Sequence, residues 1–243
     1  MKWLGVIAAL VIAGAAYGIG PWGIGVYHIL GIPMGESMIT ETDYTYEDQT
    51  YRATVNMTHG YPFKMSPVNF GLGGIVYLKP WLAAEGGFEM HTGYKNKEAR
   101  IRGTYDFAGM IDSFSWLEDE DNVTWKMMNI YVGPRFAYAV IPEFWILGRG
   151  GLLYSLSSKL EYDKTWRLLD VIGVSEKGTH LGVYGGGGFN WFVIPPKFAV
   201  TGLYTYNKLF EGTYTYSGLS TNFDEKWKPA PYFTVGTGVE YYF

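Results

Sequence analysis

Five charged side chains in this sequence could form an ion-pair network, because each lies on the polar side of a segment in which apolar and polar residues alternate. The set consists of Glu85, Glu89, Arg135, Arg149 and Glu240. Successive side chains of a strand point to opposite faces, so residues of one parity share a face. A charge in a low-dielectric interior is costly unless an opposite charge pairs with it. Carboxylates and guanidiniums on shared inner faces therefore predict a buried Glu–Arg network.

The spacing of the two arginines supports this network. Arg135 and Arg149 lie equally far from the centre of the turn at 141–143, so a hairpin places them nearly opposite each other. With a strand rise of about 3.3 Å and a tilt near 40°, each residue climbs roughly 2.5 Å, which brings Glu85 and Glu240 within about 10 Å of both arginines in height. The network could simply neutralise buried charge, or it could act as a gate.

The sequence predicts no metal site. The run "LEDEDN" groups four carboxylates at 118–121 but lacks the spacing of a calcium-binding EF-hand loop. Such a run is typical of a solvated acidic loop. The spacing of His91, His180 and Glu89 does not select a metal either, and we expect no cofactor.

Eight alternating segments could position these charges. Three stretches, 70–90, 129–154 and 182–206, each contain an alternating run, a short Pro-containing turn and a second alternating run, so each is predicted to be a hairpin. The segments 22–30 and 231–243 add one strand each.

The connections between these segments are of two kinds. Those at 79–80, 141–143 and 195–196 are tight, whereas those at 31–66, 95–123, 163–178 and 217–229 are long and polar. An even strand number, with short turns at one end and long loops at the other, is typical of bacterial membrane barrels. We therefore predict an all-β fold, an eight-stranded antiparallel up-and-down transmembrane β-barrel with short periplasmic turns and long extracellular loops.

Aromatic residues near the tight turns indicate which face of the strands meets lipid. A soluble β-sandwich or a lipocalin-like barrel would turn the apolar parity inward, and periodicity alone does not exclude this. Membrane barrels, however, carry aromatic girdles at their interfaces. We expect the membrane-interface aromatics to be Trp81, Trp145, Trp191 and Phe243.

Composition and the N-terminus fit an exported protein. Aromatic residues make up 18% of the 243 residues and charged residues only 17%, and the net charge of −4 argues against nucleic-acid binding. The start "MKWLGVIAALVIAGAAYG" has the layout of a secretory signal peptide, and its apolar run is too short for a spanning helix. We predict a cleaved signal peptide at about 1–17 and a barrel at 18–243. The sequence has no Cys, which excludes disulfides and a lipid-bearing N-terminal Cys.

The second long loop carries an apolar pattern. Its members recur at helical spacing, and Asp106 is a suitable N-cap. They are Phe107, Met110, Ile111, Phe114 and Leu117. We expect a short amphipathic helix that packs on other loops, lines an apolar vestibule or docks a partner.

The terminal stretch "VEYYF" resembles the Phe-ending signal of the small eight-stranded outer-membrane proteins, the superfamily that includes the OmpA transmembrane domain, OmpX and OmpW. This resemblance implies a place in the bacterial outer membrane, with contacts to its lipid and to lipopolysaccharide. It also implies that the barrel assembly machinery recognises the last strand, and that a Glu–Arg network can open by exchanging partners. OmpW-like members further suggest binding of a small apolar solute at a hydrophobic mouth.

The resemblance does not favour an enzyme. Lipid-modifying enzymes of this fold need a His, a Ser and a carboxylate that converge near the outer face. None of the four histidines has a Ser two residues later, as the PagL-like pattern would require. We expect no catalytic residues, although such an enzyme stays a third possibility.

The residues support two other classes of function more directly than an enzyme. One is a porin-like barrel, either a narrow channel gated by its charges or an OmpW-type carrier of small apolar solutes, and the resemblance favours this class. The other is a structural or surface-interaction barrel with a plugged lumen, whose loops bind envelope or extracellular partners.

Overall fold

The computed structural model describes residues 22–34, 38–47, 52–61, 66–107, 110–161, 175–217 and 223–243. The expected signal peptide at 1–17 lies outside the described residues, as do residues 163–174 of the third expected loop. Within the described ranges, no helix is long and apolar enough to cross a membrane.

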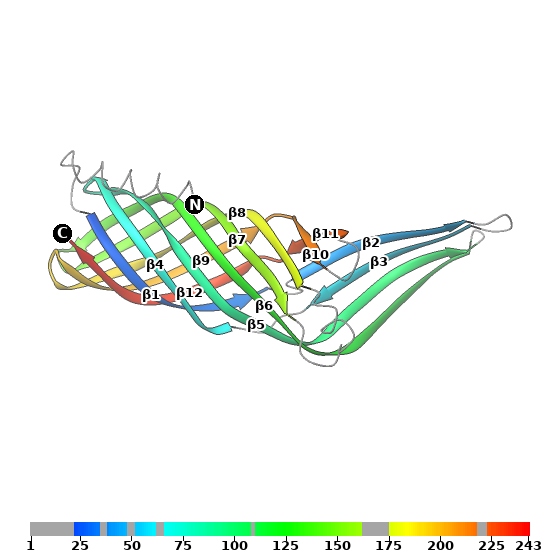
Figure 1. The fold of residues 1–243 in the computed structure, drawn as a ribbon. Coiled ribbons are helices and arrows are strands. Elements are labelled where there is room, and N and C mark those ends of the chain that lie inside the picture. Colours follow the sequence, from blue (N-terminus) through cyan, green and yellow to red (C-terminus); the bar gives the residue numbers. More distant parts are fainter. Residues whose placement is uncertain are drawn as a thin grey trace.

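A closed antiparallel barrel forms the body of the molecule (Figure 1). Its strands are β1 (Trp22–Pro33), β4 (Ser66–Lys79), β5 (Leu82–Phe107), β6 (Met110–Ile141), β7 (Phe144–Glu161), β8 (Ser175–Ile194), β9 (Phe198–Leu209) and β12 (Tyr232–Tyr242). Each strand pairs with the next in this order, and β12 closes the ring by pairing with β1 from Tyr242↔Gly23 to Tyr232↔Pro33. The prediction of an eight-stranded antiparallel barrel is confirmed.

Tight turns join neighbouring strands at one end of the barrel, which we call the turn end. They lie at Pro80–Trp81, Pro142–Glu143 and 195–197, and the last residue, Phe243, lies at the same end. The N–H of Phe243 donates to the carbonyl oxygen of Trp22 at 2.9 Å, so the ladder between the first and last strands reaches the rim.

The two faces of the wall are inverted relative to a soluble barrel. Large apolar side chains are exposed on the outside, whereas glutamate, arginine, asparagine and histidine side chains are buried inside. Exposed examples from five strands are Val26, Leu72, Val132, Leu152 and Phe189. A wall that is apolar outside and polar inside is suited to lipid around it.

Two further hairpins continue the wall at the other end. They consist of β2 (Met38–Glu47) with β3 (Arg52–Tyr61), and of β10 (Gly212–Ser217) with β11 (Phe223–Pro229). β3 pairs with the far part of β5, β11 pairs with β2, and β10 pairs with β8. The stretches 31–66 and 217–229, expected as loops, therefore contain strands, because backbone pairing with neighbouring strands carries the sheet onward.

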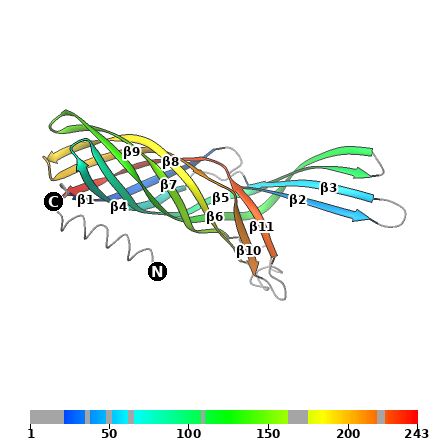
Figure 2. The same ribbon diagram turned by 90° about the horizontal axis from the view of Figure 1, so that it is seen from above.

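An elongated sheet projects beyond the barrel, as Figures 1 and 2 show. It consists of β2, β3, residues 95–107 of β5 and residues 110–123 of β6, which we call the extension. Its length follows from β5 and β6, which have 26 and 32 residues, well above the roughly 9–11 that cross a membrane.

The expected amphipathic helix at 106–117 is wrong. This stretch is the tip of the β5–β6 hairpin, in which Asp106 pairs with Ile111 and Phe107 with Met110, and Phe114 and Leu117 lie further along β6. Met110 and Ile111 are 67% and 74% exposed. A short isolated helix is marginal in water, whereas these residues extend strand ladders that begin in the barrel and also pair with β3.

Inward-facing glycines make room for the tyrosines of the lumen. A Cβ atom on Gly87 would lie 2.5 Å from Tyr131 Oη and closer still to the carbonyl oxygen of Leu72, and a Cβ on Gly73 would lie 2.7 Å from the same hydroxyl. The side chain of Tyr131 therefore lies against the backbone at Gly73 and Gly87, and any larger residue at either position would displace it.

Replacing Gly87 with alanine should lower the free energy of unfolding by about 1–3 kcal/mol, because the added methyl overpacks the lumen against Tyr131. Gly74→Ala is the matched control, since it lies on the outward parity of β4 and its Cβ would meet no atom closer than 3.9 Å. Urea unfolding in lipid vesicles, followed by tryptophan fluorescence, measures both. Equal losses for the two variants would contradict this packing.

Candidate functional site

Arg135 and Glu240 form the charged layer nearer the turn end. Arg135 Nη1 lies 2.8 Å from Glu240 Oε1, and Arg135 Nη2 lies 2.9 Å from Oε2. Both side chains are buried. Two parallel bonds between a guanidinium and a carboxylate are the strongest form of this pair.

Neighbouring side chains donate hydrogen bonds to the remaining acceptor sites of the Glu240 carboxylate. Tyr27 Oη donates to Glu240 Oε1 at 2.7 Å and Asn190 Nδ2 donates to Oε2 at 2.7 Å, while the hydroxyl of Tyr242 also donates to Oε2. The hydroxyl of Thr201 donates to Asn190 Oδ1 at 2.9 Å, which fixes the amide. A buried ion pair is tolerated when such bonds fill its remaining sites.

Arg149 and Glu85 form the second charged layer. Arg149 Nε donates to Glu85 Oε1 at 2.7 Å, and Tyr184 Oη donates to the same oxygen at 3.0 Å. The guanidinium carbon of Arg149 lies 4.8 Å from the ring centroid of Tyr131 and 5.1 Å from that of Tyr184. The charge is therefore held by a carboxylate and by two aromatic faces.

The two layers touch each other. Arg135 and Arg149 are directly paired across β6 and β7, and Arg135 Nη1 lies 3.8 Å from Glu85 Oε2. The structure thus brings together Glu85, Arg135, Arg149 and Glu240, with a carboxylate beside each guanidinium. Side-chain parity and hairpin register are the signals that located these four residues in the sequence.

Glu89 has a different partner. Its Oε2 lies 3.4 Å from Nε2 of His91, and both side chains are buried. His91 Nδ1 lies 3.0 Å from the hydroxyl of Tyr94. Among the described contacts of its carboxylate, Glu89 therefore lies with His91 and not with the arginine layers.

Aromatic side chains close the lumen toward the extension. The ring centroid of Tyr94 lies 5.3 Å from that of Trp125 and 6.2 Å from that of Tyr232, and His91 stacks beside Tyr94 at 5.7 Å. Trp125 Nε1 donates to Ser158 Oγ at 2.7 Å. We call His91, Tyr94, Trp125 and Tyr232 the outer plug, and all four side chains are buried.

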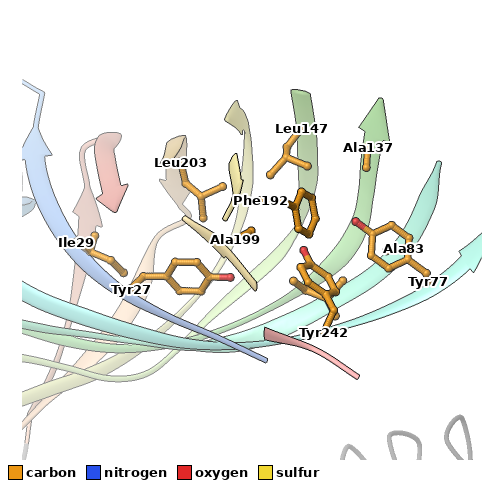
Figure 3. Packing of buried hydrophobic residues seen from close by; sticks show 11 residues of the cluster. Tyr27, Ile29, Tyr77, Ala83, Ala137, Leu147, Phe192, Ala199, Leu203 and Tyr242 are labelled. Carbon is orange, nitrogen blue, oxygen red and sulfur yellow. The ribbon is translucent and has the colours of Figure 1, made fainter. Parts of the chain in front are cut away.

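A second aromatic group lies at the turn end, where Figure 3 shows Tyr77, Phe192 and Tyr242 turned toward the inside. Trp145 joins them, with its ring centroid 5.0 Å from that of Phe192 and 6.2 Å from that of Tyr77. We call these four residues the inner plug.

The expectation that Trp145 belongs to the outer aromatic girdle is wrong. Its nearness to a tight turn suggested the girdle, but it shares the inward parity of Leu147 and Arg149 on β7. Trp81, Trp191 and Phe243 are exposed on the outside of the wall at the turn end. There Trp81 stacks on Phe136 and Phe243 stacks on Trp22.

Little space remains between these layers. A lumen cavity beside Glu89, Tyr131 and Arg149 has a volume of about 10 Å³. That is about the space of a single water molecule. Among the described residues, the interior is therefore a packed stack of inner plug, two charged layers and outer plug.

Sequence reasoning missed the polar partners of the charged layers. Tyr27, Tyr131, Tyr184, Asn190 and Tyr242 all lie on inward parities. A signal was available, because tyrosine and asparagine on the same parity as a buried charge are natural hydrogen-bond partners for it. Among the described residues, no group of three or more His, Cys, Asp or Glu side chains could hold a metal ion.

Comparisons with known proteins support the fold. The sequence matches no protein-family model and no curated protein. The outer membrane protein OprG from Pseudomonas aeruginosa is similar in structure, with a TM-score of 0.54 and 14% identity over 92% of this chain and 96% of that chain.

Two other solved barrels are more distant. The attachment invasion locus protein Ail of Yersinia pestis has a TM-score of 0.41 and 15% identity over 92% of this chain and 99% of that chain. The outer membrane protease OmpT of Escherichia coli has a TM-score of 0.39 and 13% identity over 92% and 96%.

The fold shared with OprG and the apolar outer wall lead to the same conclusion. The chain has the fold of outer-membrane β-barrels, and its outer wall is an apolar surface of the kind that faces lipid in them. Short turns of such barrels face the periplasm and long hairpins face the outside, so we expect the turn end to be the periplasmic end.

Proposed function

We propose that this protein acts at the cell surface through its extension, while the barrel serves as a membrane anchor with a lumen that does not conduct. The filled lumen carries this proposal, because two plugs and two charged layers leave a cavity of about 10 Å³ between them. A hydrated ion would need a continuous polar path, and the aromatic plugs interrupt it on both sides of the charges.

The edges of the extension suit a polypeptide partner. Residues 110–118 of β6 pair with β5, and the described pairing of β6 with β7 begins only at Thr124. Likewise, residues 41–47 of β2 pair with β3, whereas β11 pairs with 38–40. Open strand edges present backbone donors and acceptors to which an extended segment of another chain can add.

Other expected partners fit this proposal. The outer wall would contact outer-membrane lipid, the base of the extension would meet lipopolysaccharide, and the last strand would engage the barrel assembly machinery. Carriage of a small apolar solute has less support, because Met110 and Ile111 lie at the tip of a hairpin and not at the lumen mouth.

We also propose that the protein is not an enzyme. The Nδ1 atoms of the buried histidines His91 and His180 lie 3.0 Å from the Tyr94 hydroxyl and 2.8 Å from the carbonyl oxygen of Phe210. These bonds orient the two imidazoles toward structural groups.

The extension can be shortened in register, which gives a direct test. Thr40 pairs with His59, and Arg100 pairs with Leu117, so removing 41–58 and 101–116 leaves paired ends that an Asn-Gly turn can join. Cells that display the full protein should attach to serum-protein-coated glass, and cells with the shortened protein should not. The shortened barrel should still fold, as judged by its heat-modifiable mobility on gels. Equal attachment of both cell types would contradict the proposal.

A narrow gated channel is the second candidate, and one distance favours it. Arg135 Nη1 lies 2.8 Å from Glu240 and 3.8 Å from Glu85, so this guanidinium is within reach of both carboxylates. A shift of Arg135 toward Glu85 would exchange its carboxylate partner and leave Glu240 with its neutral donors Tyr27, Asn190 and Tyr242. This candidate requires the plugs to move as well, and single-channel recording separates it from the anchor role.

A further inference from the structure

A cavity of about 460 Å³ opens at the periplasmic end of the barrel, below the inner plug. This volume is within the range of about 300–1,000 Å³ that is usual for small-molecule pockets. Its walls are mostly apolar and aromatic. They include Tyr77, Leu78, Trp145, Phe192, Tyr242 and Phe243.

The floor of the cavity is firmly built. The rings of Trp145, Phe192 and Tyr242 follow one another at centroid distances of 5.0 and 5.6 Å, and Tyr77 lies 6.0 Å from Tyr242. Behind the floor, the hydroxyl of Tyr242 is bound to the carboxylate of Glu240. A ligand would therefore meet a fixed aromatic surface and would not pass into the lumen.

Positive charge lines the mouth of the cavity. Two charged side chains, Lys79 and Lys197, are among its lining residues, and both are exposed. Lys79 is the last residue of β4 and Lys197 lies in the β8–β9 connection, on opposite sides of the ring in its strand order.

Both lysines are anchored at the rim. Lys79 Nζ lies 5.6 Å from the ring centroid of Trp81, which keeps this ammonium at the interface. The N–H of Lys197 donates to the Ile194 carbonyl oxygen, and its own carbonyl oxygen accepts from the N–H of Tyr242, both at 2.7 Å. Cations that flank an aromatic pocket are complementary to a ligand with one anionic end and an apolar body.

We propose that this cavity binds a single-chain amphiphile with a carboxylate head, that is, a free fatty acid taken from the periplasmic side. Its tail lies on the aromatic floor, and its carboxylate lies at the mouth, near Lys79 and Lys197. A polar metabolite would leave the aromatic walls uncovered, and a neutral amphiphile would leave the lysines without an anion. This site is separate from the extension and does not depend on the surface role proposed above.

Native mass spectrometry of the mature barrel, refolded and released from a nonionic detergent, tests the proposal with dodecanoate as the probe. We expect one dodecanoate per barrel and at least a tenfold weaker affinity for the variant Lys79→Glu/Lys197→Glu. The matched control is Lys208→Glu/Lys228→Glu, which changes the charge equally at exposed lysines away from the turn end and should bind as the unaltered protein does. Heat-modifiable gel mobility confirms that each variant is folded.

Two further measurements locate the tail and the head. Nitroxide-labelled dodecanoate should quench the fluorescence of Trp145, seen as the difference between the unaltered protein and Trp145→Phe. Dodecanol, which lacks the carboxylate, should bind at least tenfold more weakly than dodecanoate. The proposal would be overturned by absence of the adduct, by equal binding to both lysine double variants, by equal binding of dodecanol, or by quenching that Trp145→Phe leaves unchanged.

Discussion

Replacing Arg135 with alanine should lower the free energy of unfolding by about 3–5 kcal/mol, because it leaves Glu240 as an unpaired buried charge. Arg135 supplies two of the bonds to this carboxylate, and the remaining donors are neutral. Reversible urea unfolding in lipid vesicles, read from tryptophan fluorescence, measures the loss.

A double-mutant cycle identifies the cause of that loss. Glu240→Gln alone should also destabilise the barrel, since it replaces the bidentate carboxylate of Arg135 with an amide and leaves Glu85, at 3.8 Å, as the nearest carboxylate. The double variant Arg135→Ala/Glu240→Gln removes both charges, so its loss of stability should be smaller than the sum of the two single losses. If the losses of stability of the two single variants simply add in the double variant, the bidentate pair does not stabilise this layer.

Replacing Trp125 with alanine should have an effect of similar size, about 3–5 kcal/mol, because it opens a cavity in the outer plug. Trp125 is fully buried, packs against Tyr94 and Tyr232, and donates a hydrogen bond to Ser158. Urea unfolding of the unaltered protein and of Trp125→Ala in the same lipid vesicles measures this loss.

Trp191→Ala is the matched control for the outer plug. Trp191 is exposed on the lipid-facing side of β8, where acyl chains can fill the space that a smaller side chain leaves. Its replacement should therefore cost much less than that of Trp125. A larger loss for Trp191→Ala would show that stability comes mainly from the interface with lipid and not from the packed lumen.

The barrel and its charged layers could be predicted because parity determines both. Alternation along a strand assigns each residue to lipid or lumen, and the tight turn between β6 and β7 sets Arg135 against Arg149. Proximity in the sequence to a turn is a weaker signal than parity. The place of Trp145 near the turn suggests the girdle, whereas its shared parity with Arg149 indicates the lumen.

The extension could not be predicted, because its strands depend on partners far away in the sequence. Residues 106–117 carry a helical spacing of apolar residues, yet their backbone pairs within the β5–β6 hairpin and with β3. Local periodicity does not contain these distant pairings. The role of Tyr131 was equally hidden, since it depends on Gly73 and Gly87 from two other strands.

Single-channel recording of the refolded mature protein in a planar bilayer at neutral pH tests the central claim, which is that the lumen is a packed core. We expect a silent barrel, and silence should persist in Arg149→Ala because both plugs and the Arg135–Glu240 layer remain. Discrete conductance steps in the unaltered protein, changed in size by Arg149→Ala, would contradict it and would make the charged layers a gate.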